Sequence, residues 1–205
     1  MIYLASRSPR RRELLAQIGV RFEPLLFREG ARTDQDTDEA ARPSEQAEEY
    51  VRRVTRQKCD AAWQRVLMRR GLRRMPVLAA DTTVDLAGEI LGKPADRADA
   101  ERMLRMLSGT QHRVLTCVAL QLEQRYEMVV SESLVTFTTL DEARIAAYVQ
   151  TGEPFDKAGG YGIQGLGGHL VQEVHGSLTN VIGLPLAETL TALSALMMVP
   201  GAPPS

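Results

Sequence analysis

Residues 76–94 read Pro-Val-Leu-Ala-Ala-Asp-Thr-Thr-Val-Asp-Leu-Ala-Gly-Glu-Ile-Leu-Gly-Lys-Pro, and this segment organises the chain. Its apolar run 77–80 carries no charge, which predicts a buried strand. Apolar residues then alternate on both sides of Gly88-Glu89, which predicts a β-hairpin. Asp81 follows the run, where the strand is expected to leave the core and where α/β proteins place reactive groups. A lone Asp more often only caps a turn, so its role depends on its surroundings.

Length and composition indicate one globular unit. With 205 residues, 44% of them apolar, the chain can form a single domain, predicted over residues 1–198 with a flexible tail at 199–205. The net charge of −1, from 25 basic and 26 acidic residues, gives no overall field toward nucleic acid or a membrane. We therefore expect neither as a partner.

Cysteine usage and the termini predict a cytoplasmic location. Cys59 and Cys117 lack the spacing of metal ligands and make a poor disulfide framework, which favours a reduced compartment. The arginine-rich start has no signal-peptide core after it, and Pro185 and Glu188 interrupt the longest apolar region.

The N-terminus predicts an anion site. A strand at 2–5 is followed by a serine-rich turn and a helix that begins at Pro9 with Ser8 as its N-cap. Residues 10–12 are all arginine, and cations in a first turn are opposed by the helix dipole unless an anion binds there. The alternative is a solvated basic turn. The P-loop spacing is absent from this segment.

A second cation points toward the core. The long helix predicted from Ser44 to about Arg69 carries an apolar stripe, and Lys58 lies on it two turns after Val51. A lysine there either extends its ammonium to solvent or is paired. A polar, mobile loop that contains Glu39 is expected before this helix.

The remaining elements are shorter. The patterns predict strands at 22–27, 114–120, 133–137 and 170–174, helices at 99–107 and 187–197, and a helix through Val149 capped by Thr139 and Glu142. A glycine-rich loop at 159–168 has the backbone freedom to approach a ligand.

The polar groups of these turns and loops suit a polyphosphate with a divalent metal. Basic side chains neutralise phosphate oxygens, while carboxylates hold Mg²⁺ or Mn²⁺ and activate water. The histidines are scattered, which argues against zinc, and no serine-hydrolase elbow is present.

The chain resembles Maf-like proteins, which are nucleoside triphosphate pyrophosphatases. The motifs that carry the resemblance are Leu4-Ala-Ser-Arg-Ser-Pro-Arg-Arg11, Ala80-Asp-Thr-Thr-Val84, Gly92-Lys-Pro94, Leu107-Ser-Gly109, Asp156-Lys-Ala-Gly159, Tyr161-Gly-Ile-Gln-Gly165 and Val181-Ile-Gly-Leu-Pro185. The resemblance covers residues 2–196 and implies an α/β fold of the inosine triphosphatase type. Its elongated mixed β-sheet would be flanked by helices, with two lobes around a substrate cleft. It also implies hydrolysis at the α-phosphate with a divalent cation, Mg²⁺ or Mn²⁺.

Carried over by motif, Asp81 resembles the catalytic proton acceptor, and Glu39 resembles an acid that holds the metal together with Asp81. The substrate-binding set is Ser8, Arg10, Arg11, Lys58, Thr82, Lys93, Lys157 and Gln164. The loop before Asp36 is longer than usual in the family, so the alignment of Glu39 is less secure than that of Asp81.

Arg10, Thr82 and Gln164 distinguish this chain from the branch that resembles 7-methyl-GTP pyrophosphatase. That branch has Trp, Gln and a Ser-Glu-Gly sequence at these places, so the chain resembles the dTTP/UTP branch, and we expect these nucleotides as partners. Removal of modified nucleotides, a part in cell-division arrest and a homodimer are further expectations. The alternative from another class is a non-catalytic regulator of septum formation that binds nucleotides.

Overall fold

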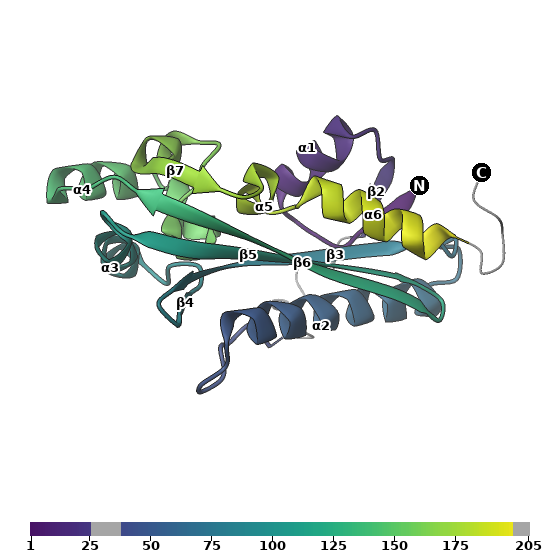
Figure 1. The fold of residues 1–205 in the computed structure, drawn as a ribbon. Coiled ribbons are helices and arrows are strands. Elements are labelled where there is room, and N and C mark those ends of the chain that lie inside the picture. Colours follow the sequence, from purple (N-terminus) through teal and green to yellow (C-terminus); the bar gives the residue numbers. More distant parts are fainter. Residues whose placement is uncertain (26–37, 199–205) are drawn as a thin grey trace.

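The computed structural model describes residues 1–25 and 38–198, and a mixed sheet forms their centre (Figure 1). The strands are β1 (Ile2–Leu4), β2 (Phe22–Pro24), β3 (Val77–Leu86), β4 (Glu89–Leu91), β5 (Gln111–Leu122), β6 (Arg125–Phe137) and β7 (Val171–His175). The helices are α1 (Pro9–Gln17), α2 (Ala47–Met68), α3 (Arg97–Leu107), α4 (Glu142–Gln150), α5 (Leu178–Ile182) and α6 (Leu186–Met197). Three 3₁₀ turns are η1 (Glu153–Asp156), η2 (Ala158–Gly160) and η3 (Leu166–Leu170).

The seven strands follow the order β2-β1-β3-β5-β6-β7, and β4 pairs with β3. The short N-terminal strands pair in parallel, whereas the pairs from β3 to β7 are antiparallel. Because β3, β5 and β6 are much longer than the others, the sheet is elongated. This confirms the predicted α/β fold with an elongated mixed sheet.

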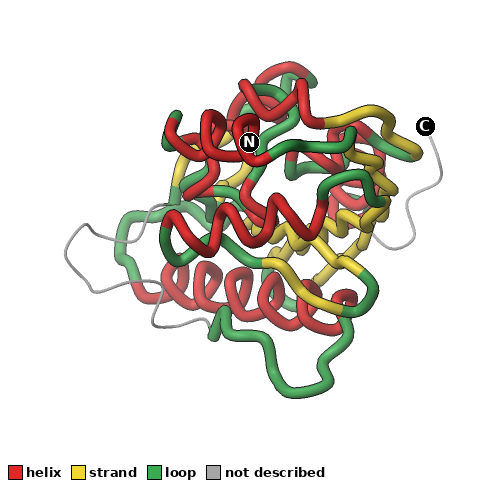
Figure 2. The backbone as a smooth tube through the Cα atoms, turned by 90° about the vertical axis from the view of Figure 1, so that its left-hand side faces the viewer, coloured by secondary structure: helices red, strands yellow, loops and turns green. Residues whose placement is uncertain are grey.

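Helices cover both faces of the sheet. Helix α2 runs along one face, and α1, α5 and α6 lie on the other, while α3 and α4 gather at one end (Figure 1). The side view in Figure 2 also shows helices on both sides of the strands. The apolar core is divided along β3: Ala80 packs with α1 and α6, whereas Val84 packs with α3 and α4. Asp81 and Thr82 lie at the junction of these two clusters.

The prediction that β3 leaves the core at Asp81 was wrong. The strand continues for five more residues, because Asp81 pairs with Cys117 and Thr82 with Thr116 in the antiparallel ladder with β5. An apolar run measures how much of a strand is buried, but the backbone ladder sets where the strand ends. Asp81 is therefore held at mid-strand on a rigid element.

Two predicted helix starts also need correction. Helix α2 begins at Ala47 instead of Ser44, because Ser44 has a positive φ of 62°, which no right-handed helix accommodates. Helix α4 is capped by Asp141, whose carboxylate accepts from the N–H of Arg144 at 2.8 Å, and not by the Thr139–Glu142 box. Helix α5 was not predicted.

Parts of three predictions fall outside the described residues: the end of the strand at 22–27, most of the polar loop before α2, and the tail at 199–205. The single domain over residues 1–198 stays a prediction. Within the described ranges, no helix combines the length and apolar character needed to cross a membrane.

Helix α5 is joined to the sheet by one buried side chain. The Asn180 side-chain amide donates to the carbonyl of Val114 at 2.9 Å and to Ser133 Oγ at 2.8 Å, and the backbone carbonyl of Asn180 accepts from Thr116 Oγ1 at 2.9 Å. These contacts place the turn after α5 beside the N-terminal helix.

Replacing Asn180 with Ala removes the donor for two buried acceptors on β5 and β6. We expect the free energy of unfolding to fall by about 1–3 kcal/mol, the usual cost of leaving a buried acceptor unpaired. Urea denaturation measures this, with the exposed Thr191→Ala variant of α6 as control. An unchanged midpoint would show that the amide is not needed to hold α5.

Candidate functional site

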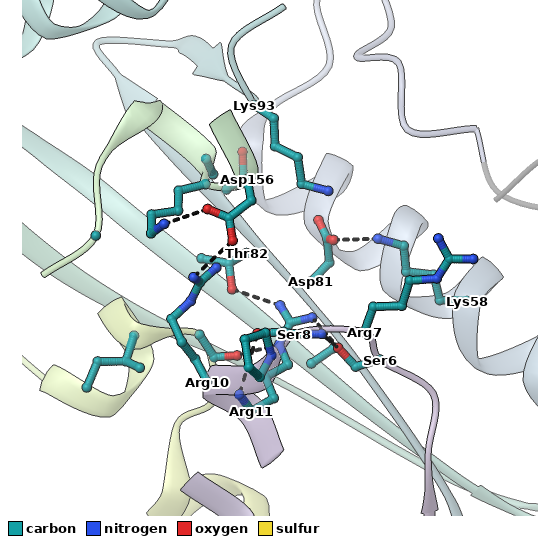
Figure 3. A pocket seen from close by; sticks show the side chains of 18 of the residues that line it. Ser6, Arg7, Ser8, Arg10, Arg11, Lys58, Asp81, Thr82, Lys93 and Asp156 are labelled. Atoms are coloured by element: carbon teal, nitrogen blue, oxygen red, sulfur yellow. Dashed lines mark hydrogen bonds and ion pairs between the residues drawn. The ribbon is translucent and has the colours of Figure 1, made fainter. Parts of the chain in front are cut away.

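A cleft of about 510 Å³ opens over the middle of β3 (Figure 3). The ten residues predicted for the site all line it: Ser8, Arg10, Arg11, Glu39, Lys58, Asp81, Thr82, Lys93, Lys157 and Gln164. They come from the β1–α1 turn, the first turn of α1, the segment before α2, α2 itself, β3, the end of the hairpin, and the segments that connect the 3₁₀ turns. The structure therefore brings together residues that are widely separated in sequence.

The cleft exists because β3 loses its neighbour for part of its length. Strand β1 pairs with β3 only as far as Leu78, and β4 begins to pair at Val84. Between these points, one edge of β3 lies next to the β1–α1 turn instead of a strand. Asp81 and Thr82 occupy this open stretch, so backbone and side-chain groups of the strand face the cleft.

Lys58 links the two acids of the predicted metal pair. Its Nζ lies 2.7 Å from Asp81 Oδ1 and 2.6 Å from Glu39 Oε1, and Figure 3 shows the contact with Asp81. Burial alone would lower the pKa of Lys58, but the two carboxylates outweigh it and raise that pKa. Burial likewise opposes ionisation of Glu39, yet the nearby ammonium lowers the Glu39 pKa. Lys58 is thus paired instead of extending to solvent.

Side chains of α2 hold Glu39 in place by hydrogen bonds to the backbone at and beside Glu39. The Tyr50 hydroxyl donates to the Glu39 carbonyl at 3.0 Å, and Arg53 donates to the carbonyls of the preceding and following residues at 2.7 and 2.9 Å. Arg53 is itself paired with Glu45 at 2.6 Å, and that hydrogen bond lowers the pKa of Glu45 to about 2. Three successive carbonyls are therefore fixed, which aims the Glu39 carboxylate at Lys58.

Arg11 lies on the opposite side of Asp81 and uses all three guanidinium nitrogens. They donate to the carbonyl of Gly183 at 2.8 Å, to Ser6 Oγ at 3.2 Å and to Thr82 Oγ1 at 3.1 Å. Its burial lowers its pKa, while the charge of Asp81 acts in the opposite direction. Ser8 is the N-cap of α1 as predicted, so the first turn carrying Arg11 is fixed as well.

The direction of the hydroxyl chain beneath Arg11 follows from counting protons. Thr116 donates its one hydroxyl proton to the carbonyl of Asn180 at 2.9 Å. Thr82 Oγ1, 2.9 Å from Thr116 Oγ1, must then donate to Thr116 and accept from Arg11. Thr82 therefore orients Arg11, a role that the sequence did not reveal.

The far wall carries further charges. Arg10 Nη1 lies 3.2 Å from Asp156 Oδ2, and Lys157 Nζ contacts Asp156 Oδ1 and donates to the backbone carbonyl of Glu153 at 2.7 Å. Gln164 and Lys93 are exposed at the rim.

Several lining residues were not assigned to the site from the sequence, among them Arg7, Tyr50, Arg65 and Asp156. Tyr50 had a usable signal, because it precedes Lys58 by eight residues on the same face of the long helix.

The lining charges favour a polyanionic ligand. Seven basic side chains and three carboxylates surround the cleft. In the part of the chain that the structure describes, no group of three His, Cys, Asp or Glu residues could hold a metal on its own. Two carboxylates that converge on one point nevertheless fit Mg²⁺, which commonly takes one or two protein carboxylates and completes its shell with water and substrate phosphates.

The family model described as Maf-like protein matches residues 1–196. The chain belongs to the Maf-like protein family. A dTTP/UTP pyrophosphatase of Dechloromonas aromatica is 52% identical over 195 residues, covering 95% of this chain and 96% of that protein. The same name belongs to a relative in Aromatoleum aromaticum, also 52% identical and covering 95% and 94%.

Among solved structures, the Staphylococcus aureus Ham1 protein aligns with a TM-score of 0.44 at 17% identity, covering 83% of this chain and 79% of that one. The family assignment rests on the family model and the relatives.

In this Maf-like protein, replacing Lys58 with Met leaves Asp81 and Glu39 facing each other without their shared cation. We expect the free energy of unfolding at pH 8 to fall by about 1–3 kcal/mol, the range for hydrogen bonds to charged groups. The loss should shrink toward pH 5. Without the ammonium the Glu39 pKa rises, so protonation relieves the repulsion as the pH falls.

Urea denaturation at both pH values checks this, and Arg52→Met is the matched control, because Arg52 pairs with Glu48 on the exposed side of the same helix. A loss that is equal at pH 5 and pH 8 would contradict the role of Lys58 as the shared cation.

Proposed function

We propose that this protein is a dTTP/UTP pyrophosphatase that hydrolyses nucleoside triphosphates to the monophosphate and pyrophosphate. The observation that carries the proposal is Asp81, a carboxylate at mid-strand whose side chain faces a cleft lined by seven basic groups. The names of the relatives, at about half identity over nearly the full chain, support the same activity.

In the proposed reaction, the guanidinium and ammonium groups of the cleft bind the triphosphate, with the N-terminus of α1 and Ser8 supplying N–H and hydroxyl donors. Asp81 takes a proton from a water molecule, whose oxygen forms a bond to the α-phosphorus. The bond between that phosphorus and the bridging oxygen of the β-phosphate breaks, and pyrophosphate leaves with the electron pair. Lys58 Nζ donates a hydrogen bond to Asp81 Oδ1 at 2.7 Å, which orients the carboxylate in the cleft.

Glu39 and Asp81 would hold the divalent metal, Mg²⁺ or Mn²⁺. When bound, it would neutralise charge on the phosphates and favour ionisation of the attacking water. The fixed backbone around Glu39 supports this assignment, since a ligand carboxylate needs a defined position.

The base would be recognised at the rim. The Gln164 amide offers a donor and an acceptor, which suits the N3–H and carbonyl edge shared by thymine and uracil. Arg10 lies on the same wall, whereas Thr82 would act through Arg11.

A cytoplasmic location, with access to the nucleotide pool, belongs to this proposal, and so does hydrolysis of modified nucleotides. The homodimer stays a prediction. The alternative of a nucleotide-binding regulator of septum formation shares the cleft but needs no turnover, so a catalytic variant separates the two functions.

Replacing Asp81 with Asn keeps the shape of the side chain and removes its basicity. We expect turnover of dTTP with Mg²⁺ or Mn²⁺ to fall about a hundredfold or more, a typical contribution of general base catalysis. Pyrophosphate release measures the rate, and circular dichroism confirms the fold. Near-normal turnover in this variant would remove Asp81 from its proposed role.

Replacing Gln164 with Glu removes an amide donor and adds a charge. We expect dTTP and UTP to lose more catalytic efficiency than CTP, ATP or GTP, because a site built for a hydrogen bond penalises an unpaired partner. A panel of these nucleotides on wild type and variant tests this. A uniform loss across the panel would place Gln164 outside base recognition.

A further inference from the structure

We propose that the Glu153 side chain is a positioning residue for base selectivity, because it holds the loop that presents Gln164 to the nucleotide. This inference rests on the proposed function. Glu153 opens η1, just after α4, and lies outside the set of residues derived above for phosphate binding and proton transfer.

The Glu153 carboxylate accepts three hydrogen bonds. Oε2 accepts from the N–H of Leu166 at 2.8 Å, and Oε1 accepts from the N–H of Gly167 and from the Tyr148 hydroxyl, each at 3.0 Å. Burial would raise the Glu153 pKa, but these donors together outweigh it and lower that pKa. The group is therefore an ionised acceptor, which makes each of its hydrogen bonds stronger than a neutral one.

Tyr148 extends the same arrangement to the other end of the loop. Its hydroxyl donates to Glu153 and accepts from the N–H of Gly162 at 3.2 Å. Gly162 lies before Gln164, and Leu166 and Gly167 lie after it. The segment 162–167 is thus held on both sides of Gln164 by one carboxylate and the phenol bonded to it.

The glycines of this segment show independently that the loop closes directly onto these side chains. A Cβ at Gly165 would lie 2.5 Å from Glu153 Oε2, and a Cβ at Gly167 would lie 2.6 Å from the Tyr148 hydroxyl oxygen. Contacts this short do not occur, so the close approach of the loop to Glu153 and Tyr148 requires residues without a side chain. This packing accounts for glycine at positions 165 and 167.

The consequence for selectivity follows from where Gln164 lies. It is an exposed residue between Ile163 and Gly165 in a segment without regular helix or strand, so its direction depends on how the loop is fixed. If the loop is released, the amide meets the base edge in only part of the population. Binding of the phosphates should change less, because Lys157 is held by the backbone carbonyl of Glu153 and not by its carboxylate.

The test is Glu153→Gln, which keeps the shape but replaces one acceptor oxygen with an NH₂ group that faces a donor. We expect the ratio of kcat/KM for dTTP to that for ATP to fall about tenfold, equivalent to about 1.4 kcal/mol. The KM for dTTP should account for most of this change, since the catalytic Asp81 is untouched. Hydrogen–deuterium exchange of the amides in 162–168 should become faster.

Glu142→Gln is the matched control, because Glu142 is an exposed glutamate near the start of α4 whose partner is Arg105. It should change neither the ratio nor the exchange. Tyr148→Phe removes only the hydroxyl and should give a smaller change of the same kind. If Glu153→Gln does not fold, the same measurements on Tyr148→Phe decide the proposal.

Faster exchange with an unchanged nucleotide ratio would overturn the proposal, since Glu153 would then hold the loop without affecting selectivity. Unchanged hydrogen–deuterium exchange in Glu153→Gln would also overturn the proposal, because Glu153 would then not hold the loop. Failure of the proposed function is seen separately, as a wild-type protein that does not release pyrophosphate from dTTP or UTP.

Discussion

The open edge of β3 is the constraint on which the site depends. A strand that lost its neighbour in the middle of a sheet would expose unpaired backbone groups, and proteins cover such edges with other segments. Here β1 stops pairing at Leu78 and β4 begins at Val84, and the interval between them lines the cleft beside the β1–α1 turn. The turn brings the N-terminus of a helix and several arginines beside Asp81. The position of the cleft is thus set by strand lengths.

The charges in this interval have to be compensated within the protein. Asp81 lies between Lys58 on α2 and Arg11 on α1, and Lys58 also contacts Glu39. Partly buried charges of this kind are costly unless they are paired and hydrogen-bonded. The protein meets this requirement with fixed donors and acceptors around Asp81, and the cleft as a whole is lined by more basic side chains than carboxylates. A bound polyphosphate would neutralise that excess, which explains why a chain with a net charge of −1 has a strongly basic cleft.

Sequence patterns correctly predicted those features of the structure that depend on residues close together in the chain. Lys58 was placed on an inward stripe by its spacing from Val51, and Ser8 was recognised as an N-cap by the proline that follows it. The end of β3 was missed because the ladder with β5 is a contact distant in sequence. The backbone contacts that fix Glu39 were missed for the same reason, since no local pattern reports that Tyr50 and Arg53 bond to carbonyls of a preceding loop. The resemblance to the family motifs named the residues that line the cleft, but it did not reveal that Thr82 accepts a hydrogen bond from Arg11.

The two walls of the cleft come from different parts of the core, which would separate chemistry from recognition in the proposed function. Asp81 lies on β3, Arg11 is carried by α1, which packs near Ala80, and Lys58 by α2, which packs near Ala79. Gln164 is instead carried by a loop that is hydrogen-bonded to Tyr148 of α4. A change in the loop can alter the presentation of Gln164 without moving Asp81, because the carboxylate of Glu153 and the ladder of β3 have no residue in common. The same arrangement of phosphate-binding and proton-accepting groups is therefore compatible with different bases. In the proposed function, selectivity would reside in a hydrogen-bonded loop, and the reaction would depend on the strand.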